Sequence, residues 1–203
     1  MKGRTIFFLL SLSAALVMLD TTLQAARPGS GKKESAVVAL AGEFRTVFAN
    51  LLWIKLDHYH HEYAARHKDW TKNRDALGLN RMITRLDPHF VEAYATGAWM
   101  LLGMGKLKDA KSYLEEGVTS NPDSMLLHDE LGTMLAVHLK DYDGSLFHLK
   151  KAYCIVKADW EIKKLRSPSK KTTAIADDEW DMRRLKRLIG SVERLQREGE
   201  GKV

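Results

Sequence analysis

The chain of 203 residues contains only one cysteine, Cys154, and only four prolines. A single cysteine cannot form an internal disulfide, so the folded state has to be stabilised by packing. The sequence also lacks a glycine-rich phosphate loop, a nucleophile elbow and a C-x-x-C-H haem motif. No pair of carboxylates suggests a catalytic cleft either. These absences argue against an enzyme, and we expect no cofactor.

The chain has only a small excess of positive charge, with 32 Lys and Arg, 26 Asp and Glu, and a net charge of +6. The richest basic clusters are Lys163–Lys171 and Arg183–Arg187. No aromatic residues interleave with them at a spacing that would stack nucleic-acid bases. We interpret both clusters as solvated surface, with attraction to anionic lipid head groups as the alternative. No nucleic-acid partner is expected.

One long apolar run, Thr5–Leu19, follows the basic residues Lys2 and Arg4. A membrane-spanning helix needs about 20 apolar residues, whereas the core of a signal peptide needs about 7–15. The run has 15 residues, and reading on to Ala26 adds only one charge. We predict that residues 1–26 are a membrane anchor, with a cleaved signal peptide and a purely structural helix as the alternatives. In the first two cases the rest of the chain is exported.

The stretch Arg27–Ser35 is typical of a linker because it is rich in Gly, Ser and Lys. The folded part is then expected over residues 36–198, which is enough chain to bury one sizeable core. A single domain is therefore predicted.

An internal repeat occupies the middle of the chain. Its first copy, Val91–Ser124, spans 34 residues, and its second, Met125–Lys157, has one extra residue in its turn and lacks the closing proline. Small residues in the repeat mark the places where two helices of a pair can approach closely. The equivalent positions are Tyr94 and His128, Gly97 and Leu131, Ala98 and Gly132, Leu101 and Leu135, Ala110 and Ser145, Leu114 and Leu149, and Gly117 and Ala152.

This pattern and its period resemble the tetratricopeptide family, whose signature is W-x2-L-G-x2-Y, then A-x3-F, then P. The resemblance implies an all-α fold, an α-solenoid of helical hairpins. A more degenerate unit upstream ends at Asp87–Pro88, as the next unit ends at Asn121–Pro122. We therefore expect about three hairpins, over residues 43–88, 89–122 and 124–157, and a capping helix over about residues 178–197.

The first helix of the upstream unit is expected over about Glu43–Ala65, with an apolar stripe at helical spacing. The stripe consists of Phe48, Leu52, Leu56, Tyr59 and Tyr63. The segment Phe44–Leu102 is also similar to a group of membrane-anchored bacterial tetratricopeptide proteins, through its Phe-Arg opening, Leu-Trp-Ile core and Thr-Arg-Leu-Asp-Pro junction. Together with the N-terminal run and its basic flank, this resemblance predicts a single-pass protein of the bacterial inner membrane with a periplasmic repeat domain. Secretion after signal cleavage is the alternative.

Stacked hairpins curve, and the first helix of each hairpin lines the concave side. Trp99 stands opposite Ala98 and Leu101 on its helix, so we expect it to be half exposed in this groove, where a tryptophan commonly anchors a bound segment. The alternative is that a neighbouring hairpin or the insertion Arg66–Asn73 covers it. The predicted partner-binding residues are Trp53, Asp57, Trp99, Leu102, Asp129 and Thr133, with Glu130 adding polarity.

Eight histidines raise the question of a metal site, and the densest group contains His58, His61 and Glu62. These three lie within one helical turn, so two of them could share a metal ion. The protease pattern H-E-x-x-H is not met, and no further ligands have suitable spacing. We interpret the histidines as helix-surface and interhelical residues, with a metal-dependent enzyme as a third functional class.

The sequence thus predicts a protein-interaction scaffold of the bacterial cell envelope, which binds a partner segment in the concave groove. The alternative is a structural subunit of a larger envelope or secretion assembly, in which the repeats pack permanently. Protein partners and the inner membrane are expected to bind the chain, and self-association is left open.

Overall fold

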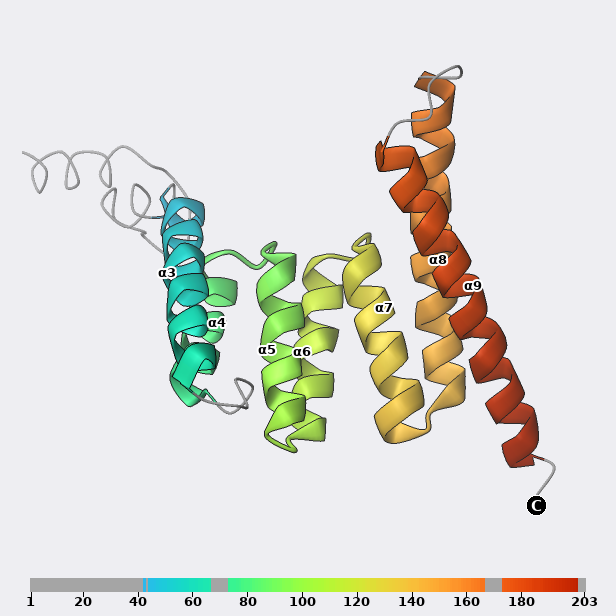
Figure 1. Cartoon of the computed structure of the whole chain (residues 1–203), viewed down its shortest axis with the longest axis horizontal. Coiled ribbons are helices and arrows are strands. Elements are labelled where there is room, and N and C mark those ends of the chain that lie inside the picture. The colour runs from blue at the N-terminus through green and yellow to red at the C-terminus, as the bar shows by residue number, and fades with distance from the viewer. Residues whose placement is uncertain (1–41, 43, 67–72, 167–172, 201–203) are drawn as a thin grey trace, which may run out of the picture.

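The computed structural model describes residue 42 and residues 44–66, 73–166 and 173–200. Over these residues the chain forms seven α-helices and one π-helix, with no strand (Figure 1). The all-α prediction is therefore confirmed for this part of the chain. The elements are α3 (Arg45–Arg66), α4 (Arg74–Leu86), α5 (Val91–Gly103), α6 (Leu107–Ser120), α7 (Met125–Met134), the π-helix η2 (Leu135–Leu139), α8 (Tyr142–Arg166) and α9 (Thr173–Glu200).

Successive helices run antiparallel and lie side by side, which gives the hairpins α3–α4, α5–α6 and α7–α8, with α9 packed along α8 (Figure 1). The first helices of the hairpins form one row that α9 continues, and the second helices form another row behind it. This is the arrangement of an α-solenoid. The predicted membrane segment, residues 1–26, lies outside the described residues, as does the linker. Among the helices that are described, none is both long and apolar enough to span a bilayer.

The small residues of the repeat lie where large side chains of the paired helix enter. The Tyr113 ring of α6 lies against Gly97 of α5, and the Tyr94 ring of α5 lies against Gly117 of α6. Both tyrosines are buried, and their ring centroids are 5.0 Å apart. A side chain at either glycine would occupy the space of a ring. The close approach of α5 and α6 therefore depends on both glycines.

The two proline-containing junctions at the ends of the hairpins are in direct contact. The Asn121 side-chain amide donates to the Pro88 carbonyl oxygen at 2.9 Å, and Asn121 Oδ1 is 3.2 Å from Nδ1 of His89. These contacts join one hairpin to the next at the same edge of the molecule. The repeat of Asp-Pro and Asn-Pro in the sequence thus reflects a repeated contact between neighbouring units.

The extra residue of the second repeat is accommodated by the π-helix η2. In the first repeat the Lys106 amide donates to the Leu101 carbonyl, five residues back, at 2.8 Å. In the second, the Asp141 amide donates to the equivalent Leu135 carbonyl, six residues back, at 3.0 Å. A single inserted residue in a helix is commonly absorbed as a π-bulge. The insertion therefore widens the end of α7 without displacing α8.

The turn after η2 places a lysine in a backbone conformation that favours glycine. Lys140 has a φ of 57°, whereas Gly105 at the equivalent turn has a φ of 73°. We expect Lys140→Gly to raise the free energy of unfolding by about 0.5–1 kcal/mol, because a Cβ is strained in this region. The reverse test, Gly105→Ala, should lower it by about 1 kcal/mol. Urea midpoints measure both, and a Lys140→Gly midpoint at or below that of the parent would contradict the assigned turn.

Two helices are longer than expected, and one predicted stripe is shifted. α9 begins at Thr173 rather than near residue 178, and α8 continues to Arg166. These extensions support each other, because Lys163 of α8 donates to both carboxylate oxygens of Asp178 of α9, at 2.8 and 3.0 Å. In the stripe on α3, Leu56 is buried and Leu52, Tyr59 and Tyr63 are half-buried.

The prediction was wrong at Phe48, which is 52% exposed, while Ala49 beside it is buried. The reason lies in the lengths of the helices, since α3 has 22 residues and α4 has 13. The first turns of α3 therefore extend past their partner helix, which leaves a large side chain there about half exposed.

Candidate partner-binding groove

A pocket of about 240 Å³ opens between α3 and α5 in the row of first helices. Two tryptophans from different hairpins stand at it, Trp53 from α3 and Trp99 from α5. The Trp53 ring also packs against Phe90, with centroids 5.2 Å apart, and this contact fixes its position. The pocket is lined by Trp53, Leu56, Asp57, His60, Thr96, Trp99 and Met100.

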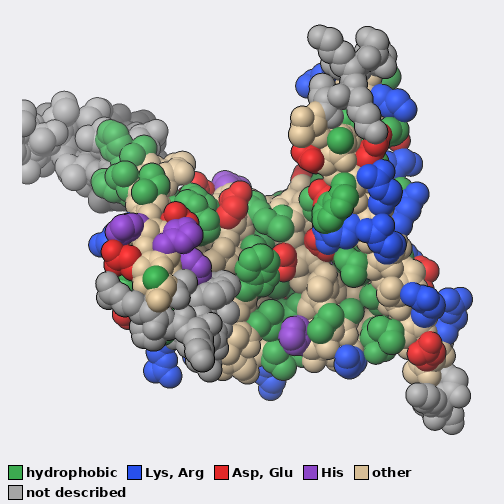
Figure 2. Space-filling model, viewed as in Figure 1, with side chains coloured by type: hydrophobic (Ala, Val, Ile, Leu, Met, Phe, Trp, Pro, Cys, Tyr) green, Lys and Arg blue, Asp and Glu red, His purple; other side chains and the backbone are tan. Residues whose placement is uncertain are grey.

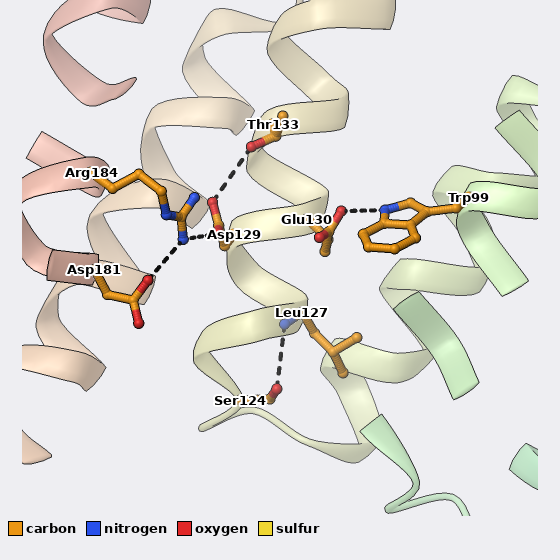
Figure 3. Close-up of polar contacts among 8 residues, drawn as sticks. All are labelled: Trp99, Ser124, Leu127, Asp129, Glu130, Thr133, Asp181 and Arg184. Atoms are coloured by element: carbon orange, nitrogen blue, oxygen red, sulfur yellow. Dashed lines mark hydrogen bonds and ion pairs between the residues drawn. The ribbon is translucent and has the colours of Figure 1, made fainter. Parts of the chain in front are cut away.

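Trp99 is 44% exposed, so it lies half open to solvent, as its position on the helix indicates. Its indole Nε1–H donates to Oε2 of Glu130 on α7 at 2.7 Å (Figure 3). This bond joins the second hairpin to the third and sets the plane of the ring. Burial raises the pKa of Glu130 above its usual range, and the Trp99 bond and the charge of Arg184 act against this rise. The indole is thus held in place before any partner arrives.

Asp129 lies next to Glu130 but faces α9 instead of the pocket. It is buried and pairs with the guanidinium of Arg184, which also lies 3.4 Å from the Asp181 carboxylate (Figure 3). The Thr133 hydroxyl donates to Oδ1 of Asp129 at 3.5 Å. These side chains join α7 to α9. They are already engaged within the chain and offer no free acid to a partner.

The structure therefore divides the six predicted groove residues into two groups. Trp53, Asp57 and Trp99 line one pocket. Asp129 and Thr133 lie at the contact with α9. Leu102 is half-buried and packs against the core cluster shared by α5, α6 and α7, and it is not among the residues that line the pocket.

Three pocket residues were not singled out from the sequence, although helical spacing could have indicated them. Thr96 and Met100 lie three residues before and one residue after Trp99, and His60 lies three residues after Asp57. Thr96 and His60 are therefore on the same side of their helices as a residue that was predicted, and Met100 shares a side with Thr96, four residues before it. What helical spacing cannot give is which side of α3 faces which side of α5.

The histidines of α3 pair with different carboxylates rather than converging. Nε2 of His58 is 3.2 Å from Glu62, and Nε2 of His61 is 3.5 Å from Asp57. Within the described ranges, no group of three or more His, Cys, Asp or Glu side chains could hold a metal ion. Asp57 keeps a side chain that is 66% exposed, at the rim of the pocket.

Two other histidines form a pair between α7 and α8. His128 Nε2 is 3.0 Å from the Pro122 carbonyl oxygen, and its Nδ1 is 2.9 Å from Nδ1 of His148. A carbonyl only accepts, so Nε2 of His128 carries the proton and its Nδ1 accepts from His148. Burial lowers the pKa of both residues, and the nearby charge of Lys151 adds to this for His128. Protonation of His128 would place a hydrogen on both facing nitrogens.

This pair should make the fold less stable in mild acid. Since unfolding raises both pKa values toward about 6.5, the unfolded chain binds more protons below that pH. The pair therefore contributes its full stabilisation above pH 6.5, and the free energy of unfolding decreases as the pH falls below that value. We expect a smaller fall between pH 7.5 and 5.5 in His148→Asn than in the parent, while His138→Asn, at an exposed position, keeps the parent slope. Equal slopes in all three proteins, from urea unfolding, would contradict the assignment.

No protein-family model matches the sequence, and no curated protein matches it. Solved structures do match. A T3SS complex from Aeromonas hydrophila is 13% identical with a TM-score of 0.55, over 78% of this chain and 89% of that chain. PcrH, in complex with the chaperone binding region of PopD, is 13% identical with a TM-score of 0.51, over 71% and 92%. The chain shares their helical-repeat fold.

Proposed function

We propose that this chain is a protein-binding scaffold of the tetratricopeptide type, which holds a segment of a partner protein in its groove. The observation that carries the proposal is the pocket between Trp53 and Trp99. Two aromatic side chains are positioned by contacts within the fold, yet they leave an open apolar space between neighbouring hairpins. Pockets of this kind receive the apolar anchor residues of bound segments. In support, PcrH, a protein of similar fold, is in complex with a region of PopD.

The charges around the pocket define the chemistry of the segment. Asp57 stands exposed at one side, and Glu130 stands beside Trp99 on the other. The nearby cation, Arg184, is already paired with Asp129. A segment with one apolar side chain for the pocket and a Lys or Arg next to it would satisfy both features. We place the scaffold at the outer face of a bacterial inner membrane, on the grounds of the apolar run Thr5–Leu19 and its basic flank.

The test uses a photo-reactive benzoyl-phenylalanine in place of Trp99, in cells. We expect an adduct with a distinct partner protein. Thr96→Phe should abolish the adduct by filling the pocket. The matched control is the same probe at Phe147 of α8, an aromatic residue that is 67% exposed on a helix of the second row. The Phe147 probe should not form the adduct.

An adduct that forms equally from Phe147, or that persists in Thr96→Phe, would contradict a binding site in the groove. Whether the partner exchanges distinguishes a scaffold with a bound ligand from the alternative, a structural subunit. A partner that newly made protein replaces in a pulse–chase experiment is a bound ligand. A partner that never exchanges would favour the structural subunit.

A further inference from the structure

The hairpin of α8 and α9 projects beyond the other hairpins, at the edge of the molecule where α3 begins (Figure 1). α8 has 25 residues and α9 has 28, whereas α5, α6 and α7 have between 10 and 14. The far end of this hairpin therefore extends past the shorter helices of the row. Large apolar side chains nevertheless stand there, since Ile162 is 47% exposed and Leu165 is 81% exposed. We call this end, from Trp160 to Arg166 with the first turn of α9, the hairpin tip.

The hairpin tip also has a hollow of about 580 Å³, lined by Trp160, Glu161, Lys164 and Leu165. Within it the Lys164 ammonium lies 4.4 Å from the centre of the Trp160 ring. The indole Nε1 of Trp160 is buried and has no hydrogen-bond partner among the described residues. Exposed aliphatic side chains beside a basic residue, as at Ile162, Lys164 and Leu165, are typical of a surface that meets the head groups of a lipid bilayer.

Only some of the basic side chains at the hairpin tip are paired with acidic residues, so the tip keeps a positive charge. Lys163 pairs with Asp159 and Asp178, and Lys157 pairs with Glu161. In the part of the chain that the structure describes, Lys164 and Arg166 form no ion pair. The described stretch Trp160–Arg166 contains three Lys and Arg and one acidic residue. Figure 2 shows Lys and Arg side chains gathered along this arm of the molecule.

A second apolar patch lies at the same edge, on the first turns of α3. These turns project past α4, and their apolar side chains are about half exposed. Figure 2 shows them as hydrophobic surface next to the point where the described part of α3 begins. The patch consists of Phe44, Val47, Phe48 and Leu51. The apolar run Thr5–Leu19, predicted to enter a membrane, precedes this patch in the chain.

We propose that the hairpin tip docks on an anionic lipid surface, as a second membrane contact beside the start of α3. Ile162 and Leu165 would enter the boundary between head groups and acyl chains, and Lys164 and Arg166 would pair with lipid phosphates. Two contacts at one edge fix the orientation of the solenoid on the bilayer. The proposal does not depend on the groove, which opens on the face of the first helices instead of at this edge.

The test uses the full chain bound to vesicles of phosphatidylcholine and phosphatidylglycerol, with Cys154→Ser removing the native thiol. A nitroxide is attached through Thr173→Cys at the hairpin tip, or through Lys108→Cys at the opposite edge. We expect the nitroxide at position 173 to be shielded from a water-soluble nickel chelate and accessible to oxygen. The nitroxide at position 108 should stay open to the chelate. The ratio of shielded to open signal at 173 should fall about fivefold in Lys164→Gln and at least about tenfold in Leu165→Asn.

Lys106→Gln, which removes a basic residue from the opposite edge, is the matched control and should leave the ratio unchanged. The proposal is overturned if the chelate reaches position 173 as freely as position 108. It is also overturned if shielding is the same without vesicles, which would indicate a second copy of the chain. Equal shielding on vesicles of phosphatidylcholine alone would remove the role of anionic lipid. Failure of any kind here leaves partner capture at Trp99 unaffected, so the two proposals can fail separately.

Discussion

Gly97→Leu is expected to lower the free energy of unfolding by about 3 kcal/mol or more, at the upper end of the range for an overpacked core. A Cβ at this position would lie 2.3 Å from Cε1 of Tyr113, well inside van der Waals contact. The ring cannot move aside easily, because its hydroxyl is 3.1 Å from Thr84 Oγ1 and donates to the Asn80 carbonyl at 3.2 Å. The Arg81 guanidinium lies over the ring, 3.8 Å from its centre. The added side chain must therefore force α5 and α6 apart.

The matched control is Gly78→Ala on α4, where an added Cβ meets nothing within 4 Å. Alanine is the better helix former, so this change should raise the free energy of unfolding by about 0.5–1 kcal/mol. For a domain of this size, about 1 kcal/mol corresponds to about 2–4 °C in Tm, so calorimetry should show shifts of opposite sign. A Gly97→Leu protein that melts like the parent would show that α5 and α6 do not pair through this glycine.

The burial of Tyr113 offers a second check on the same packing. Burial raises the pKa of Tyr113 to about 12, although its bond to Thr84 and the charge of Arg81 act in the opposite direction. A spectroscopic titration should therefore show a late transition well above the ordinary tyrosine pKa of about 10. In Gly97→Leu this late transition should shift down, because the displaced ring gains access to water.

Much of the fold could be predicted because it depends on local spacing. The repeat of small residues at a period of about 34 indicates which helices pair, and the positions of Gly97 and Gly117 indicate where they approach. The single inserted residue was also visible in the sequence. That it forms a π-helix was not, because a turn with one more residue would have given the same repeat length. The projection of α8 past Lys157 was missed because its polar side chains are paired with residues of α9, as Lys163 is with Asp178.

The groove was predicted in part for the same reason. Trp53 and Trp99 lie on the first helices of their hairpins. Helical periodicity alone places both side chains on the side of those helices that faces the groove. The partner of Asp129 could not be predicted, because Arg184 is 55 residues away in sequence, on a helix whose packing beside α7 is not indicated by local spacing. An acid on a predicted groove face is free or engaged according to what packs beside it. That information comes only from the arrangement of the helices.

Trp99→Ala is expected to weaken capture of the partner segment about thirtyfold or more, since truncating a buried aromatic anchor typically costs about 2 kcal/mol or more of binding. The side chain is 44% exposed in the free chain, so much of its burial occurs only when a partner covers it. The loss of stability should therefore be smaller than for a core deletion. Titration of the captured segment measures the affinity, and thermal unfolding measures the stability.

Two further variants separate the contributions of the ring. Trp99→Phe keeps the apolar surface but removes the Nε1–H bond to Glu130, so it should lose less affinity than Trp99→Ala. Phe147→Ala, at an exposed aromatic of the second row, should leave the affinity unchanged. If Trp99→Ala instead lowers the Tm as much as a core deletion and leaves capture intact, then Trp99 serves packing between the second and third hairpins. The partner would in that case have to bind elsewhere, and the structural-subunit alternative would be favoured.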